Sequence, residues 1–318
     1  MIETSAKTAS TDSASTDAVT TGTAAEIRRR LVAAGLDPDH VARVARMTVE
    51  EDLAGGIDAT SAATVPAEAR CTADFAVRTD GVVAGLPVAA AVLEFVSGGA
   101  AVIEFHVEDG DRVKAGTVLF TVTGRTRDLL TAERSMLNLL CHLSGVATLT
   151  RTWVDAVEGT GAKIRDTRKT TPGLRLLEKY AVRCGGGVNH RMALSDAAMV
   201  KDNHVVAAGG AVEAFQLVRA QYPELPVEVE VDSLDQLLPV VAAGAELILL
   251  DNFTPDRMRA AVLLVGRNEP YGRTLLEASG GLTLDVARAA AESGVDYLSV
   301  GALTHSAPIL DIGCDFRE

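Results

Sequence analysis

The sequence has few aromatic residues, few cysteines and no long apolar run. Phe, Trp and Tyr make up 4% of its 318 residues, and the four cysteines, Cys71, Cys141, Cys184 and Cys314, show no CxxC spacing. Isolated cysteines are more typical of buried thiols in a reducing compartment than of disulfides or metal ligands. We therefore expect a cytoplasmic protein. No apolar run approaches the roughly 18–20 residues that span a bilayer, which argues against a membrane protein.

Basic residues are also in the minority. Lys and Arg number 30 against 43 Asp and Glu, a net charge of −13, which disfavours binding to nucleic acid or to an anionic membrane. Residues 166–204, here called the cationic run, depart from this balance. Their cations are Arg168, Lys169, Arg175, Lys179, Arg183, Arg191 and Lys201, with His190 and His204 beside them. A local cluster on an acidic background predicts a site for a small polyanion.

The first 23 residues are almost all Ser, Thr, Ala and Asp. They lack the basic segment and apolar stretch of a secretory signal. Because they offer little apolar surface to bury, we expect residues 1–23 to form a disordered tail.

Residues 70–123 contain short β-branched runs broken by Gly and Asp, which predict a small sandwich of strands and helices at 24–135. A helical pattern follows over residues 127–144 and is expected to end at Gly145. Arg134 lies on the apolar stripe of this helix. It is either an arginine whose head reaches water at the edge of the stripe, or a charge that a rigid helix delivers to a site.

After residue 160, strand-like runs alternate with helical stretches. The runs are AKIRDT, AAMVK, PVEVEV, ELILLDN, TLLEASG and VDYLSVG. This rhythm is typical of βα units, and their number suits an open barrel of about six strands at 136–303, although a doubly wound sheet remains an alternative. In both architectures ligands bind at the carboxyl ends of the strands.

The expected strand ends bear cations first, then carboxylates, then glycine turns. They are Arg168, Lys169, Lys201, Glu230, Asp251, Ser279-Gly280-Gly281 and Gly301-Ala302. Carboxylates suit Mg²⁺, and backbone N–H groups at a helix start suit phosphate, so this pattern predicts a site for a phosphorylated sugar with a metal. Guanidinium groups beside His190 suit a dicarboxylate. The alternative is that these charges are solvated or paired, with Glu230 and Lys201 as a structural ion pair.

The cationic run, DTRKTTPGLRLLEKYAVRCGGGVNHRMALSDAAMVKDNH, closely resembles the quinolinate phosphoribosyltransferase family. AERSMLNLLCHLSGVATLT before it, and VEVEVDSLDQ, LILLDNF, LEASGGL and VDYLSVGALTHSAPILDIGCDF after it, extend the resemblance from about residue 25 to the C-terminus. The resemblance implies that quinolinate and phosphoribosyl pyrophosphate give nicotinate mononucleotide, pyrophosphate and CO₂, with Mg²⁺. It also implies an N-terminal α/β sandwich, rejoined by a strand at about 304–318, an open α/β barrel, and a homodimer with shared active sites.

The resemblance also implies roles for particular residues. Lys169, Lys201, Glu230 and Asp251 would be catalytic, and the two carboxylates would hold Mg²⁺. The quinolinate site would comprise Arg134 reaching into the partner's site, Thr167, Arg168, Lys169, His190, Arg191 and Lys201. The phosphoribosyl pyrophosphate site would comprise Lys169, Lys201, Glu230, Asp251, Ser279, Gly280, Gly281, Gly301 and Ala302.

Two alternative functions remain at this point. One is a related phosphoribosyltransferase acting on nicotinate or another planar acid, which would need fewer guanidinium groups. The other is a non-catalytic phosphosugar-binding or carrier module, because VEDGDRVKAGTVLFTVTG resembles the turn of lipoyl carriers. Lys114 is displaced from the tip of that turn, and a carrier would not need a barrel.

Overall fold

The computed structural model describes residues 24–266 and 274–317, so the tail expected at 1–23 lies outside the described residues. In the described residues, no helix is both long and apolar enough to cross a membrane. All four cysteines are free thiols. The expectation that all four are buried is wrong: only Cys141 is, because the others lie near the end of an element or in an edge strand.

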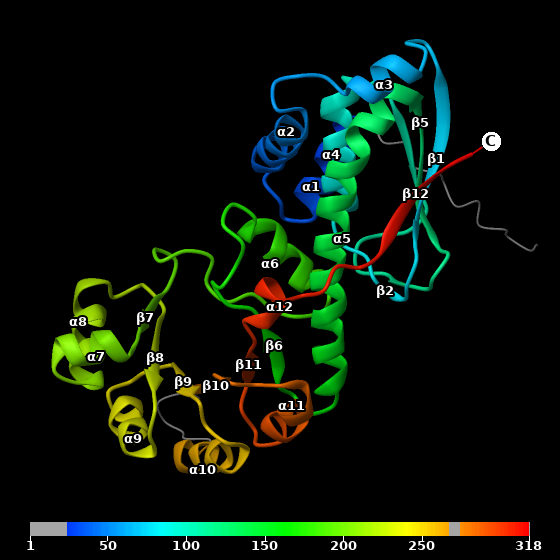
Figure 1. Ribbon diagram of the computed structural model, residues 1–318. Helices are drawn as coiled ribbons and strands as arrows, with labels where there is room; N and C mark the ends of the chain where they lie inside the picture. The colour runs from blue at the N-terminus through cyan, green and yellow to red at the C-terminus, as the bar shows by residue number, and fades with distance from the viewer. Residues whose placement is uncertain (1–23, 267–273, 318) are drawn as a thin grey trace, which may run out of the picture.

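The N-terminal body is an antiparallel sheet with helices packed against one face (Figure 1). Its strands lie in the order β12-β1-β5-β3, so the last strand of the chain completes the sheet. Phe75 stacks on Phe120 in its core, with ring centroids 4.5 Å apart. The predicted α/β sandwich is confirmed. Its elements are α1 (Ala24–Ala33), α2 (Pro38–Leu53), α3 (Ala59–Thr64), β1 (Arg70–Val77), β2 (Gly81–Val82), α4 (Leu86–Ser97), β3 (Val102–Phe105), β4 (Arg112–Val113), β5 (Val118–Arg125) and β12 (Ile312–Phe316).

Helix α5 (Thr126–Ala156) connects the two bodies. The helix end expected at Gly145 is wrong, because this glycine serves a close approach rather than a stop. A Cβ atom at position 145 would lie 2.2 Å from the carbonyl oxygen of Pro308. The missing side chain therefore lets the C-terminal segment cross the helix, where Leu310 N donates to Cys141 O at 3.0 Å. The domain boundary expected at residues 135 and 136 lies inside this helix.

The second body is a parallel six-stranded sheet surrounded by helices, in the order β6-β11-β10-β9-β8-β7. All six predicted strands are confirmed. The elements are β6 (Lys163–Arg165), α6 (Arg175–Cys184), β7 (Ala198–Val200), α7 (Asp202–Ala208), α8 (Ala211–Gln221), β8 (Val227–Val231), α9 (Leu234–Ala242), β9 (Leu247–Asp251), α10 (Pro255–Val265), β10 (Leu275–Ser279), α11 (Leu284–Ala291), β11 (Tyr297–Ser299) and α12 (Ala302–His305).

The strand order shows how the sheet is wound. From β7 to β11 each strand lies beside its predecessor without the reversal of a doubly wound sheet, which excludes that alternative. Strands β6 and β7 follow one another in the chain but form opposite edges, and within the described residues no ladder joins them. The barrel is therefore open. The connection over residues 166–197, which contains α6 and most of the cationic run, is long because it passes from one edge to the other.

Candidate active site

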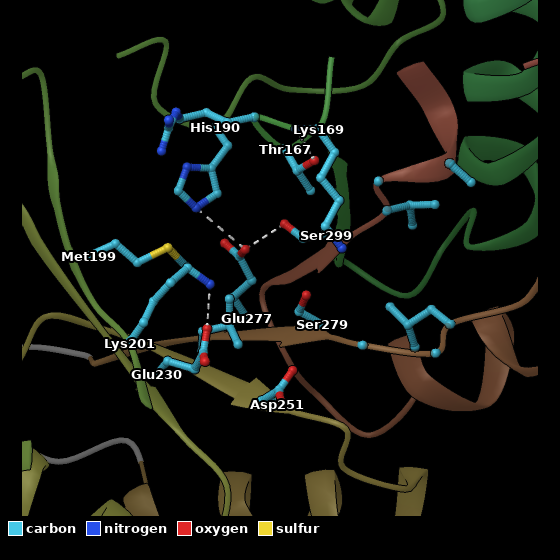
Figure 2. Close-up of a pocket in the computed structure, with 18 of the residues that line it drawn as sticks. Thr167, Lys169, His190, Met199, Lys201, Glu230, Asp251, Glu277, Ser279 and Ser299 are labelled. Carbon is cyan, nitrogen blue, oxygen red and sulfur yellow. Dashed lines mark hydrogen bonds and ion pairs between the residues drawn. The ribbon is translucent and has the colours of Figure 1, made fainter. Parts of the chain in front are cut away.

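A cavity of about 540 Å³ lies at the carboxyl ends of the parallel strands (Figure 2). It collects every residue expected at the site except Arg134: Thr167, Arg168, Lys169, His190, Arg191, Lys201, Glu230, Asp251, Ser279, Gly280, Gly281, Gly301 and Ala302. These residues come from all six strand ends of the parallel sheet and from the NHR segment. The remaining lining residues were not predicted: Met199, Leu249, Glu277, Leu282, Ser299, Val300 and His305.

One wall of the cavity carries guanidinium groups. Nε of Arg168 is buried and has no hydrogen-bond partner among the described residues, while Arg191 Nη1 donates to the carbonyl oxygen of Ala197 at 2.7 Å. Burial, and then the charge of Arg168, lower the pKa of Arg191. Two like charges that are partly withdrawn from water favour an anion between or beside them.

The opposite wall carries carboxylates. Lys201 Nζ lies 2.8 Å from Glu230 Oε2, so the ion pair considered in the sequence exists. The Lys201 side chain is nevertheless 46% exposed, which leaves its ammonium group accessible from the cavity. Burial, followed by the charge of Glu230, raises the pKa of the Asp251 carboxyl. Two neighbouring hard oxygen donors that repel each other are suited to a divalent cation.

The turn after β10 lines the cavity with backbone. Gly280 and Gly281 have φ angles of +86° and +61°, in the left-handed region. A Cβ atom at position 280 would lie 2.3 Å from Asn252 Oδ1. The turn therefore requires glycine, and neither residue has a side chain of its own that could cover the backbone.

His190 is held from both ring nitrogens. Nδ1 accepts a hydrogen bond from Arg191 N at 2.7 Å, and Nε2 lies 2.8 Å from Glu228 Oε2. This arrangement fixes the neutral tautomer with its proton on Nε2. Burial lowers the pKa of His190 to about 4. Donation to a substrate carboxylate would therefore require His190 to exchange one of these bonds.

Glu277 forms the floor beneath the cavity and is completely buried. It accepts hydrogen bonds from Arg165 Nη1 and Ser299 Oγ, both at 2.5 Å. Its Oε1 lies 3.7 Å from His190 Nε2 (Figure 2). Ligand atoms of His190, Glu228 and Glu277 lie within 4.8 Å of one another, as in a metal site. Because protein donors already occupy both oxygens of Glu277, we regard this cluster as a hydrogen-bonded floor.

The sequence contained a signal for two of the missed residues. Side chains two positions apart on a strand point to the same face. Glu277 precedes Ser279 by two positions, and Ser299 likewise precedes Gly301. A polar residue two positions before a predicted strand-end ligand could therefore have been assigned to the same cavity.

Arg134 lies outside the cavity of its own chain. It is exposed on α5 and forms no hydrogen bond or ion pair with any residue that the structure describes. Its guanidinium group is therefore available to bind a ligand or another protein chain.

Comparison with known proteins identifies the family. Residues 58–144 match the quinolinate phosphoribosyl transferase N-terminal domain, and residues 146–315 match the C-terminal domain of the same family. The chain belongs to the quinolinate phosphoribosyl transferase family. Its two family domains thus meet within helix α5, close to Gly145.

Relatives in the quinolinate phosphoribosyl transferase family are similar over most of their length. The nicotinate-nucleotide pyrophosphorylase [carboxylating] of Mycobacterium leprae is 57% identical over 85% of this chain and 95% of its own. A probable enzyme of that name from Synechocystis is 44% identical over 76% and 82%. The solved nicotinate-nucleotide pyrophosphorylase of Francisella tularensis is 36% identical, with a TM-score of 0.83 over 89% of this chain and 98% of that one.

Proposed function

We propose that this protein transfers the phosphoribosyl group of phosphoribosyl pyrophosphate to quinolinate and removes CO₂, giving nicotinate mononucleotide and pyrophosphate. The main support is one cavity that unites guanidinium groups, a carboxylate pair and glycine turns in a chain of this family. The two substrates together carry about seven negative charges at neutral pH. A dense cationic wall inside an acidic protein meets that requirement.

Quinolinate is expected to bind along the guanidinium wall. Arg168 and Arg191 offer bidentate donors for its two carboxylates, and Thr167 and His190 shape the same end of the cavity. Each charge-assisted contact contributes about 1.5–3 kcal/mol. Lys169 and Lys201 are assigned to the region between quinolinate and the sugar.

Phosphoribosyl pyrophosphate is expected to bind across the remaining strand ends. Glu230 and Asp251 would hold the ribose hydroxyls, and backbone N–H groups of Ser279-Gly280-Gly281 and Gly301-Ala302 would hold the 5′-phosphate. The carboxylate pair also fits Mg²⁺, since hard oxygen donors of like charge suit that ion. When bound, Mg²⁺ would offset the negative charge of the pyrophosphate.

The proposed chemistry needs positioning and electrostatics but no covalent intermediate with the protein. The pyridine nitrogen forms a bond to ribose C1 as the C1–oxygen bond breaks, and the pyrophosphate leaves with that electron pair. The ring nitrogen becomes positive, so the adjacent carboxylate can depart as CO₂ and leave its bonding electrons on the ring carbon. Lys169 or Lys201 then supplies a proton to that carbon.

We further propose a homodimer with shared sites. Arg134 is exposed and has no partner in its described chain, as expected of a group that binds a quinolinate carboxylate in the neighbouring subunit. The dimer would place both copies of this arginine over the two barrel mouths.

The decisive experiment is a coupled assay of CO₂ and pyrophosphate release from phosphoribosyl pyrophosphate with quinolinate or with nicotinate. We expect both products with quinolinate and neither at a comparable rate with nicotinate. Turnover of nicotinate instead would favour the related transferase, and binding of both substrates without product would favour a non-catalytic module.

A further inference from the structure

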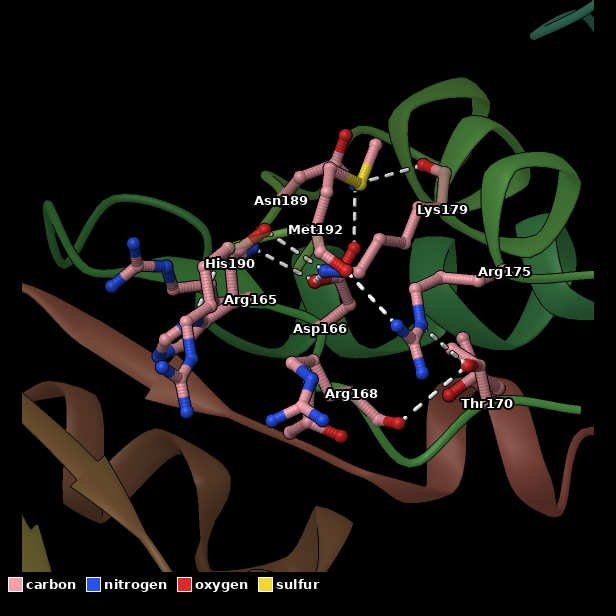
Figure 3. A network of polar contacts seen from close by, with 12 residues as sticks. Arg165, Asp166, Arg168, Thr170, Arg175, Lys179, Asn189, His190 and Met192 are labelled. Carbon is pink, nitrogen blue, oxygen red and sulfur yellow. Dashed lines mark hydrogen bonds and ion pairs between the residues drawn. The ribbon is translucent and has the colours of Figure 1, made fainter. Parts of the chain in front are cut away.

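A buried polar junction joins the two segments that carry the guanidinium wall (Figure 3). Asp166, which has no exposed surface, lies directly before Thr167 and Arg168. Its Oδ1 accepts a hydrogen bond from His190 N at 2.8 Å, and its Oδ2 accepts one from Asn189 Nδ2 at 2.5 Å. One carboxylate therefore ties the segment after β6 to the segment before Arg191.

Lys179 of α6 contacts both segments of the junction. It is completely buried, forms an ion pair with Asp166 Oδ1, and donates to the carbonyl oxygen of His190 at 2.9 Å. Its own carbonyl oxygen accepts from Asn189 Nδ2 at 2.8 Å. Burying such a pair is a poor source of stability compared with apolar side chains of the same volume, so its effect on local geometry is the more informative property.

The helix that bears Lys179 is itself anchored on both sides of this residue. Glu178 contacts His142 Nε2 of α5 at 2.9 Å, and Tyr180 donates to Asp109 of the N-terminal body at 2.6 Å. Lys179 thus reaches the junction from a fixed support.

Asp166 and Lys179 do not line the cavity, whereas Arg168 and Arg191 do. Arg168 lies two positions after Asp166, and Arg191 directly after His190. Any change in the junction would move these two guanidinium groups relative to each other. Among the residues that the structure describes, Glu230, Asp251 and the glycine turns form no hydrogen bond or ion pair with Asp166 or Lys179.

We propose that Asp166 and Lys179 are positioning residues that set the separation of the Arg168 and Arg191 guanidinium groups and so select a planar dicarboxylate. This inference rests on the proposed function. It assigns recognition of the aromatic substrate, and not of the phosphorylated sugar, to a pair of side chains that never touch it.

The test is the double variant Asp166→Asn/Lys179→Met, which keeps side-chain volume and leaves no unpaired buried charge. Titration calorimetry with quinolinate, together with steady-state kinetics, should show at least a tenfold rise in Kd and KM for quinolinate, because a displacement of about 1 Å can cost up to a hundredfold. KM for phosphoribosyl pyrophosphate should stay within twofold. Asn189→Ala, at a half-buried position, should shift the quinolinate constants several-fold and provides the test if the double variant does not fold.

Tyr180→Phe is the matched control, since it removes one hydrogen bond from the same helix while the contact between Glu178 and His142 still holds that helix in place. It should lower Tm and leave both KM values unchanged. Wild-type constants for quinolinate in the folded junction variants, or an equal rise for both substrates, would overturn the positioning role. A wild-type protein that does not bind quinolinate would instead overturn the proposed function itself.

Discussion

Ionisable side chains beneath the cavity are paired with one another in a way that fixes their protonation. His190 uses both ring nitrogens within the protein, and Glu277 uses both oxygens. Burial raises the pKa of Glu228 to about 7 and lowers that of His190 to about 4. The floor of the site therefore carries less charge than its composition suggests.

The low pKa of His190 has a measurable effect on stability. Its folded value is about 4 against 6.5 in the unfolded chain, so the folded state binds fewer protons between these values. The contribution of His190 to the free energy of unfolding is therefore fully present above pH 6.5 and decreases as the pH falls towards 4. The loss amounts to up to about 3 kcal/mol. NMR titration should show a histidine that does not protonate between pH 5.5 and 8. His190→Asn identifies the signal, and a midpoint near 6.5 would contradict the assignment.

Removal of single cations from the walls should slow the reaction. We expect Lys201→Ala and Arg168→Ala each to lower kcat/KM by at least about tenfold to a hundredfold, as the loss of one charge-assisted contact predicts. Steady-state kinetics with both substrates measure this. Lys114→Ala is the control, because Lys114 is 84% exposed in the N-terminal body and pairs with Asp80. Near wild-type kinetics in both cavity variants would remove the site assignment.

At the scale of elements, periodicity predicted the strands well and one helix end poorly. The parallel strands are short apolar runs between turn residues, and local sequence is sufficient to define them. Gly145 was expected to stop a helix because glycine often does so. Its actual role depends on Pro308, more than 160 residues away, and no local pattern contains that contact.

Helix α5 should be sensitive to any side chain at position 145. Alanine has a higher helix propensity than glycine by about 1 kcal/mol, but its Cβ would overlap the Pro308 backbone. The clash prevails, and Gly145→Ala should destabilise the protein by about 1–3 kcal/mol. Urea unfolding measures the difference. Asn138→Ala, at an exposed position of the same helix, should be neutral or slightly stabilising, and an equal gain at position 145 would show that the crossing is loose.

At the scale of the whole molecule, the strand ends predicted most of the cavity, because parallel strands bring their carboxyl ends together. Residues at the floor, such as Glu277, were missed because they precede those ends. Periodicity could not show that Arg134 lies outside its own cavity. Its place on the apolar stripe of α5 is compatible both with an arginine whose head reaches water and with a charge delivered to a site.

Shared sites predict complementation between subunits. Arg134→Ala and Lys201→Ala should each be nearly inactive, whereas a mixture after subunit exchange should recover up to about a quarter of wild-type activity, because half the dimers are hybrids with one intact site in two. Mass spectrometry verifies the exchange. Arg168→Ala mixed with Lys201→Ala should recover nothing, since both changes lie in the wall of one subunit's own cavity. Absence of rescue in the first mixture would count against the shared site.

The strand order also governs when the enzyme can take shape during synthesis. Strand β6 is made first in the second body, yet its neighbour in the sheet is β11, which ends at Ser299. The connection rich in Lys and Arg leaves the ribosome roughly a hundred residues before that neighbour exists. Chains truncated ahead of β11 should therefore be unable to assemble a binding-competent pocket, however complete their list of ligand residues.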